Sequence, residues 1–133
     1  MTAEPLIIHH YPGSPFAEKI RRILAYKRQP WTAVRAPAVL PKPDLVALTG
    51  GYRKVPVLQL GNHVYCDTAL IARVIEARAP EPALYSQPMA AALAAWADDQ
   101  LFNAALPYVL RPTKLDSMLK WFTQDELTRF ADD

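Results

Sequence analysis

The chain has 133 residues, a length that predicts one domain, or one domain with a short extension. Hydrophobic residues make up 51% and charged residues 21%, an ordinary globular composition that excludes a disordered or collagen-like chain. The one cysteine excludes an internal disulfide and favours a reducing compartment. No apolar run reaches the ~18 residues of a membrane span and no signal-peptide pattern is visible, so we expect a soluble cytoplasmic protein with no membrane partner.

Charge is unevenly distributed along the chain. The net charge of +2 is too small to predict a nucleic-acid partner. Residues 1–66 carry nine Lys or Arg and three acidic residues, whereas residues 67–133 carry six and ten. A basic first half could attract a small anionic ligand, and a solvated surface that is uneven by chance accounts for the same counts.

The N-terminal segment predicts a strand, a helix and a second strand. Residues 6–8 form a short apolar run rich in β-branched side chains, which is typical of a buried strand. Ser14 followed by Pro15 has the pattern of a helix N-cap and a first helical residue. Pro30 ends this helix, and residues 31–35 can form the second strand. The expected apolar face of the helix comprises Phe16, Ile20, Ile23 and Leu24.

The next segment predicts an irregular loop and a β-hairpin. Residues 36–51 hold three prolines and two glycines, so we expect a loop with a short helix at 44–48. Two apolar runs, 55–60 and 63–66, flank Gly61-Asn62. A two-residue connection of this kind between apolar runs is typical of a hairpin.

A further helix is predicted directly after the hairpin. Asp67 or Thr68 caps it, and it ends before Pro80. Its expected apolar face comprises Leu70, Ile71, Val74 and Ile75. The predicted order is therefore β-α-β-α-β-β-α, an α/β unit that we assign to residues 1–80.

The sequence changes character after the prolines near residue 80. Residues 81–133 are expected to form an all-α segment, of which 88–106 is rich in alanine and helical. Pro107 and Pro112 are expected to break or kink that helix. Residues 123–126 have the form of a capping box, which predicts the start of a last helix. The larger apolar residues of the alanine-rich helix are Leu93, Trp96, Leu101 and Leu106.

Three short stretches could carry chemistry. The N–H groups and the dipole of a helix start favour an anion at Ser14, including a ligand thiolate, although Ser14 could equally be only a cap. Pro56 could form a cis bond that turns the Val55 backbone toward a peptide-like ligand, although most such bonds are trans. Asp67 and Thr68 could bind an ammonium and a carboxylate group, or act as plain helix caps.

These stretches together resemble the glutathione S-transferase family. The matching motifs are Tyr11-Pro12-Gly13-Ser14-Pro15-Phe16-Ala17-Glu18-Lys19-Ile20-Arg21, Lys42-Pro43, Lys54-Val55-Pro56-Val57-Leu58 and Asp67-Thr68 followed by Ile71-Ala72. The resemblance covers roughly residues 5–80, with the motifs in the family's order and spacing. It implies a thioredoxin-like domain that binds glutathione, followed by a helical segment.

The resemblance implies a role for each matching residue. The Ser14 hydroxyl would hydrogen-bond the glutathione sulfur and favour its thiolate, since oriented donors depress a thiol pKa. Pro56 matches the family's cis-proline, and the Val55 backbone would pair with the cysteinyl unit. Asp67 and Thr68 would hold the γ-glutamyl group. The other implied glutathione contacts are Phe16, beside Ser14 in its motif, and Lys42 and Lys54 near the glycyl carboxylate, unless the two lysines are only solvated surface.

Three further features of the sequence bear on which chemistry the protein could carry out. Ser14 cannot form a mixed disulfide, which argues against the thiol–disulfide chemistry of relatives that have cysteine there. Cys66 is expected to be a small buried residue, and a thiol oxidoreductase would need it exposed with a lowered pKa. Adjacent histidines on a strand, His9 and His10, point to opposite faces, so we predict no metal site.

The predicted helical segment is short for a transferase of this kind. After residue 82 there is room for two or three helices, so the chain is either a shortened relative or a piece of a longer one. The leading hypothesis is a glutathione S-transferase-like protein that conjugates the glutathione thiolate to an electrophilic small molecule, with a homodimer implied by analogy. The alternative is a non-catalytic thioredoxin-like module that binds glutathione or a protein partner.

Overall fold

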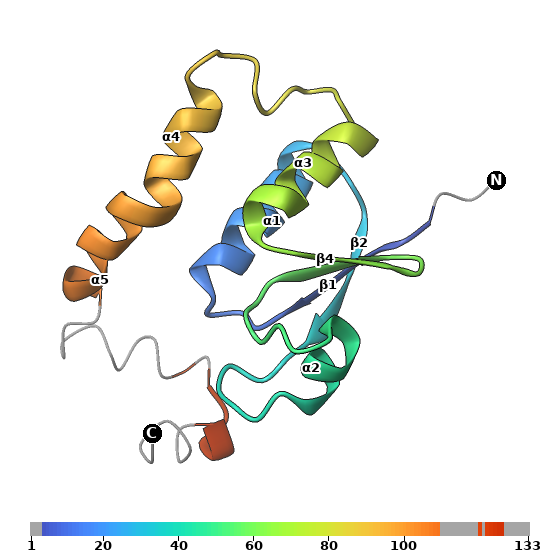
Figure 1. Ribbon diagram of the computed structural model, residues 1–133, viewed down its shortest axis with the longest axis vertical. Helices are drawn as coiled ribbons and strands as arrows, with labels where there is room; N and C mark the ends of the chain where they lie inside the picture. Colours follow the sequence, from blue (N-terminus) through green and yellow to red (C-terminus); the bar gives the residue numbers. More distant parts are fainter. Residues whose placement is uncertain (1–3, 110–119, 121, 127–133) are drawn as a thin grey trace.

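The computed structural model describes residues 4–109, 120 and 122–126, and a four-stranded sheet lies at its centre (Figure 1). The strands are β1 (Leu6–His10), β2 (Trp31–Arg35), β3 (Val57–Leu60) and β4 (His63–Cys66). Their order in the sheet is β2-β1-β3-β4. The β1–β2 pair is parallel, whereas β1–β3 and β3–β4 are antiparallel.

The predicted strands are confirmed, with shifted ends. β1 extends to His10, because His9 pairs with both neighbouring strands and His10 pairs with Arg35 of β2. β3 begins at Val57, two residues later than predicted, since Pro56 has no N–H to donate to a ladder. The hairpin is also confirmed: Leu60 pairs with His63, and Gly61 has a φ of 56° in the turn between them.

Three helices complete the α/β unit. They are α1 (Pro15–Tyr26), α2 (Pro43–Thr49) and α3 (Thr68–Arg78). Ser14 caps α1 and Asp67 caps α3, each accepting a backbone N–H with its side chain. The β-α-β-α-β-β-α order makes this unit a thioredoxin-like fold, as predicted.

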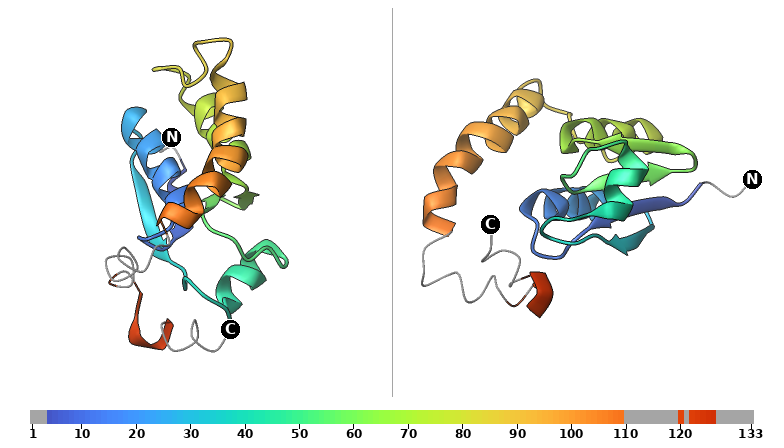
Figure 2. Two further views of the ribbon diagram at one scale, coloured as in Figure 1. Left: turned by 90° about the vertical axis from the view of Figure 1, so that its left-hand side faces the viewer. Right: turned by 60° about the horizontal axis from the view of Figure 1, so that its bottom comes forward.

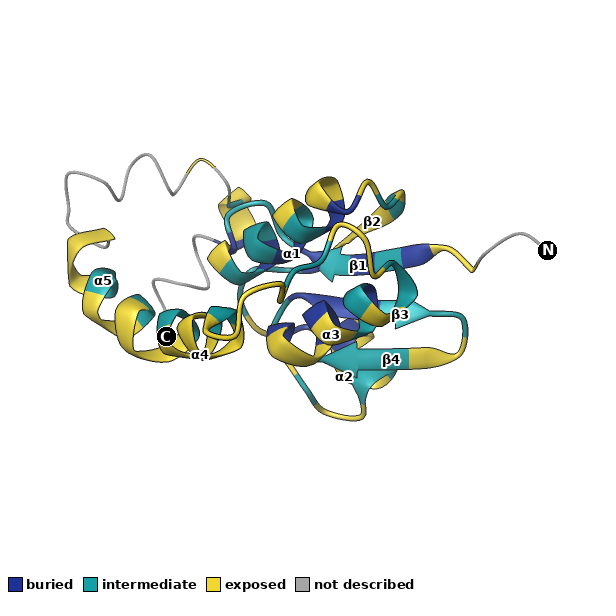
Figure 3. Ribbon diagram, turned by 90° about the horizontal axis from the view of Figure 1, so that it is seen from above, coloured by how far each residue is buried: buried dark blue, intermediate teal, exposed yellow. Residues whose placement is uncertain are grey.

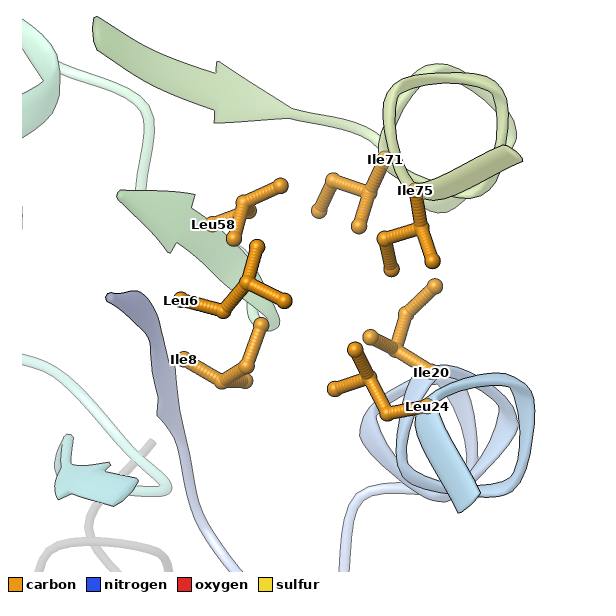
Figure 4. Close-up of a cluster of buried hydrophobic side chains, with 7 residues drawn as sticks. All are labelled: Leu6, Ile8, Ile20, Leu24, Leu58, Ile71 and Ile75. Atoms are coloured by element: carbon orange, nitrogen blue, oxygen red, sulfur yellow. The ribbon is translucent and has the colours of Figure 1, made fainter. Parts of the chain in front are cut away.

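The core lies between the sheet and the pair α1 and α3 (Figure 4). The sheet contributes side chains from β1 and β3, and the two helices contribute side chains that point toward them. The fully packed members are Leu6, Ile8, Ile20, Leu24, Leu58, Ile71 and Ile75. Leu70, predicted on the apolar face of α3, is instead 47% exposed, whereas Ile71 and Ile75 turn toward the sheet and Val74 packs against the core.

The predicted alanine-rich helix forms an arm beside the α/β unit (Figure 2). It consists of α4 (Ala90–Trp96), a π-helical turn η1 (Ala97–Leu101) and α5 (Phe102–Val109). Its larger apolar side chains Leu93 and Trp96 are exposed, and the arm is mostly exposed in Figure 3. The π turn was not predicted, since nothing in the local residue pattern marks it.

The sequence predicted that Pro107 breaks or kinks the helix of the arm; the break is wrong, and the kink stays a prediction. Pro107 lies inside α5, which continues to Val109, because losing one backbone hydrogen bond near a helix end does not stop the helix. Pro112 lies outside the described residues. Within the part of the chain that the structure describes, no helix is both long and apolar enough to cross a membrane.

The predicted capping box is confirmed near the C-terminus. The Thr123 N–H donates to Glu126 Oε2 at 2.8 Å, and the Glu126 N–H donates to Thr123 Oγ1 at 3.2 Å. Residues 124–126 are helical. The division into domains at residue 80 stays a prediction.

Candidate functional site

A groove runs past the start of α1 and contains all eight residues that sequence reasoning singled out. It consists of two adjoining cavities of about 670 and 410 Å³, which share Phe16, Lys54 and Val55. The first cavity adds Ser14 and Lys42. The second adds Pro56, Asp67 and Thr68. The fold therefore brings together residues that are spread over more than fifty positions of the chain.

Ser14 lies at the point where the groove meets the N-terminus of α1. Its side chain is buried, and its Oγ accepts the N–H of Ala17 at 3.2 Å. An oxygen that accepts here still has its own proton to donate. Ser14 also borders a separate cavity of about 640 Å³, lined in part by His10, Arg21 and Phe122.

Tyr11 is a groove residue that sequence reasoning missed. Its ring lies beneath the Lys42 ammonium, 5.8 Å from the ring centre, and 6.3 Å from the ring of Phe122. Burial raises the pKa of Tyr11, and this effect outweighs a hydrogen bond with Ser14 that acts in the opposite direction. The phenol therefore stays protonated at neutral pH. A tyrosine directly after a strand and before a Pro-Gly turn was the available signal.

Cationic side chains gather at one end of the groove. Lys42 is buried, and burial lowers its pKa although the Glu126 carboxylate opposes the shift. Lys54 and Arg53 are exposed and line the same cavity. The sequence left two alternatives for each lysine, a ligand contact or a solvated surface position. The burial of Lys42 excludes the solvated surface position for that residue. Lys54 is exposed, so both alternatives remain open for it.

The Val55–Pro56 bond is cis, the rarer of the two alternatives that the sequence left open. Pro56 is completely buried. Val55 is half-buried and lies where the two cavities of the groove meet.

Acidic and hydroxyl groups gather at the other end. Asp67 has a φ of 74° and accepts the Ala69 N–H at 2.9 Å, so the capping role is confirmed. The Thr68 hydroxyl is buried and accepts a hydrogen bond from Lys19 at 3.1 Å. Lys19 is also ion-paired with Asp98 of the π turn.

The arm contributes to this end of the groove as well. Asp98 and Asp99 line the second cavity, and the sequence analysis did not name either of them. Phe102 lines the first cavity and packs against Phe16, with ring centres 4.7 Å apart. Only the contact between the arm and α1 places these residues in the groove.

Cys66 and the two histidines, which the sequence analysis also considered, lie outside the groove. Burial raises the pKa of the half-buried Cys66 thiol, which opposes thiolate formation. His9 Nε2 lies 3.0 Å from the side-chain oxygen of Gln59, and His10 Nδ1 accepts from Arg21 at 2.8 Å. Among the described residues there is no group of three or more His, Cys, Asp or Glu side chains that could hold a metal ion.

The sheet order, the helix layer and the groove at the start of α1 define a thioredoxin-like domain with a groove along one end of its first helix. The family model for the glutathione S-transferase N-terminal domain matches residues 8–83. The chain therefore belongs to the glutathione S-transferase family.

Solved structures agree with this assignment. A GST-like protein from Pseudomonas syringae is 53% identical, with a TM-score of 0.76, over 83% of this chain and 41% of that chain. A glutathione S-transferase from Rhodospirillum rubrum is 30% identical, with a TM-score of 0.63, over 71% and 45%. A glutathione transferase homolog from Drosophila mojavensis, solved with bound glutathione, shares the fold at 14% identity and a TM-score of 0.52, over 59% and 36%. No curated protein matches the chain.

This chain spans less than half the length of each of these three solved proteins.

Proposed function

We propose that the chain binds glutathione in the groove and transfers its thiolate to an electrophilic small molecule. The observation that carries the proposal is the polarity of the groove. Lys42 and Arg53 line one cavity and Asp67, Asp98 and Asp99 line the other, with the Ser14 hydroxyl at the start of α1 beside them. Glutathione is a peptide with a carboxylate at one end and an amino acid group at the other, so its charges match this arrangement.

In this proposal each end of the peptide has a partner. Lys42 and Lys54 attract the glycyl carboxylate, and the backbone of Val55 pairs with the cysteinyl unit. Asp67 attracts the γ-glutamyl ammonium, and Thr68 and the N–H groups at the start of α3 favour its carboxylate. Phe16 packs against the ligand between these ends. The match to the family's N-terminal domain supports this orientation.

The chemical step is nucleophilic attack by the thiolate. The Ser14 hydroxyl and the dipole of α1 stabilise negative charge on sulfur and so lower the pKa of the thiol. The sulfur then forms a bond to an electrophilic carbon, either expelling a leaving group or adding to an activated double bond. The protein contributes orientation and charge stabilisation and forms no covalent intermediate.

Calorimetric titration with glutathione tests the binding part of the proposal. Wild type is expected to bind, and Asp67→Asn is expected to bind roughly tenfold or more weakly, because it loses a charge-assisted contact but keeps a side-chain oxygen for the cap. Asp44→Asn is the matched control, since Asp44 is an exposed acid in the first turn of α2. A folded wild type that does not bind glutathione would contradict the proposal.

The alternative is a non-catalytic module that binds glutathione or a protein partner. The Thr68 hydroxyl already accepts a hydrogen bond from Lys19, and this contact favours the alternative. The two proposals differ in one measurement. A transferase accelerates the reaction of glutathione with a simple aromatic electrophile, whereas the module binds glutathione without accelerating that reaction.

Two further expectations belong to the same proposal: a cytoplasmic location and a homodimer. The exposed apolar side chains of α4, Leu93 and Trp96, support self-association.

A further inference from the structure

Arg21 forms a network around the turn that precedes Ser14. Its Nη1 donates to His10 Nδ1 at 2.8 Å, and its Nη2 donates to the Pro12 carbonyl at 2.9 Å. Its Nε donates to Glu18 Oε2 at 2.8 Å, and its Nη2 lies 2.7 Å from the same oxygen. One side chain therefore joins the end of β1, the turn and the first part of α1.

The peptide unit between Pro12 and Gly13 is the part of this turn that the Arg21 side chain holds. The Ser14 N–H donates to the Tyr11 carbonyl at 3.3 Å, which closes a four-residue turn with Pro12 and Gly13 at its centre. Proline and glycine at these positions allow two turn types, which differ by a flip of the peptide unit between them. Gly13 does not have the positive φ of the flipped form. The bond from Arg21 holds the Pro12 carbonyl, and so favours the observed orientation.

We propose that Arg21 is a positioning residue that holds the Tyr11–Ser14 turn in the orientation in which the Ser14 hydroxyl and the start of α1 face the groove. The inference rests on the proposed function where it concerns glutathione, because Arg21 does not line the groove and acts only through the turn. A planar guanidinium can donate to His10, Pro12 and Glu18 at the same time. An ammonium group at the end of a lysine cannot span these three acceptors.

The test compares Arg21→Met with Arg22→Met. Arg22 is the next residue of α1, its side chain is 80% exposed, and it pairs with Glu18 at 2.9 Å without reaching the turn. Both variants remove one positive charge and one ion pair with Glu18. If Arg21→Met does not fold, Arg21→Lys replaces it, since lysine keeps the charge but loses the fork geometry.

Two readouts are needed. The first is amide hydrogen exchange of Gly13 and Ser14 without ligand, which should become roughly tenfold or more faster in the Arg21 variant, as expected for a lost hydrogen bond to a charged group. The second is the ultraviolet absorbance of the thiolate of bound glutathione against pH. The Arg21 variant should shift the pKa of the bound thiol up toward the ~8.5 of a free thiol.

The outcomes separate the two proposals. Unchanged exchange at Gly13 and Ser14 in a folded Arg21 variant would overturn the positioning role, as would equal effects of the Arg21 and Arg22 substitutions. Faster exchange with an unchanged thiol pKa would overturn the link between the turn and the thiolate. If wild type does not bind glutathione, the proposed function fails, while the exchange measurement still decides whether Arg21 holds the turn.

Discussion

Ser14 combines a structural and a proposed chemical role in one hydroxyl group. Its oxygen caps α1 by accepting the Ala17 N–H, and the same group lines the groove. The cap was predictable because Ser-Pro at a helix start is a local pattern. The place of Lys42 in the same groove was not predictable, since Lys42 reaches it through the fold of the loop that precedes α2.

Two substitutions separate these roles of Ser14. Ser14→Ala loses both, so we expect a loss of roughly 0.5–2 kcal/mol in unfolding free energy and sharply lower turnover. Ser14→Asp keeps an acceptor for the cap but places a carboxylate where the thiolate would lie, so stability should persist while thiolate formation is suppressed. Chemical denaturation and a glutathione-conjugation assay measure the two effects. Turnover in Ser14→Asp equal to that of wild type would remove Ser14 from the mechanism.

At the scale of elements, a buried lysine connects α1, α3 and the segment that follows α3. The Lys27 side chain has no exposed surface and forms an ion pair with Glu76. Its Nζ donates to the carbonyls of Ala79 at 2.6 Å and Pro82 at 2.9 Å. The Glu76 carboxylate also accepts the Leu84 N–H, at 3.1 and 3.2 Å. In the sequence Lys27 was one basic residue among fifteen, and only the packing of two helix ends makes it a core residue.

Removing the charge of Glu76 should therefore destabilise the fold. Glu76→Gln keeps an oxygen for the Leu84 N–H but leaves the Lys27 ammonium buried without its counter-ion, and we expect a loss of about 3–5 kcal/mol. Glu81→Gln, at an exposed acid of the same segment, should change stability by no more than about 0.5 kcal/mol. Urea denaturation of both variants measures the difference. Equal stabilities would show that the ion pair does not hold these elements together.

At the scale of the whole molecule, the C-terminal capping box contacts the loop that lines the groove. The Glu126 side chain is buried, accepts the Ala38 N–H at 2.6 Å and lies 3.4 Å from Arg35. Burial acts to raise the pKa of Glu126, but the hydrogen bonds from Thr123 and Ala38 outweigh it, so the pKa is lowered. A carboxyl group whose pKa is lower in the folded state than in the unfolded state stabilises the fold at any pH above its unfolded-state pKa. This contribution is lost as the pH falls through the folded-state pKa.

The contact should therefore weaken in acid. The amide of Ala38 is expected to exchange slowly at neutral pH and to lose protection as pH falls below about 4.5, the ordinary value for the carboxyl group. Glu126→Ala should lower the free energy that protects the Ala38 amide by about 1–3 kcal/mol at all pH values, because it leaves the Ala38 N–H without its acceptor. Glu126→Gln should show less protection than wild type and no loss with pH in that range. An acid-dependent loss that persists in Glu126→Gln would assign the effect to another group.

The sequence by itself determined the features in which the hydrogen-bond donor and acceptor lie only a few residues apart in the chain. The Ser14 and Asp67 caps, the hairpin at Gly61 and the capping box at Thr123 all follow from local patterns, and so does the order of strands and helices. The resemblance of ordered motifs also selected eight of the residues that line the groove, although it did not select Asp98, Asp99 or Phe102. The cap and turn predictions succeeded because a cap or a turn depends on a few neighbours that are adjacent in the chain.

Tertiary structure alone decided which polar and apolar side chains are buried and which distant residues they contact. Leu70 has the helical spacing of a core residue but is exposed, whereas Lys27 is fully buried. Asp98 reaches Lys19 across 79 positions of the chain, and Arg21 is directed to the Pro12 carbonyl by the way α1 follows β1. Burial and long-range pairing depend on which surfaces the packed elements cover, and that free energy is shared among residues that are distant in sequence.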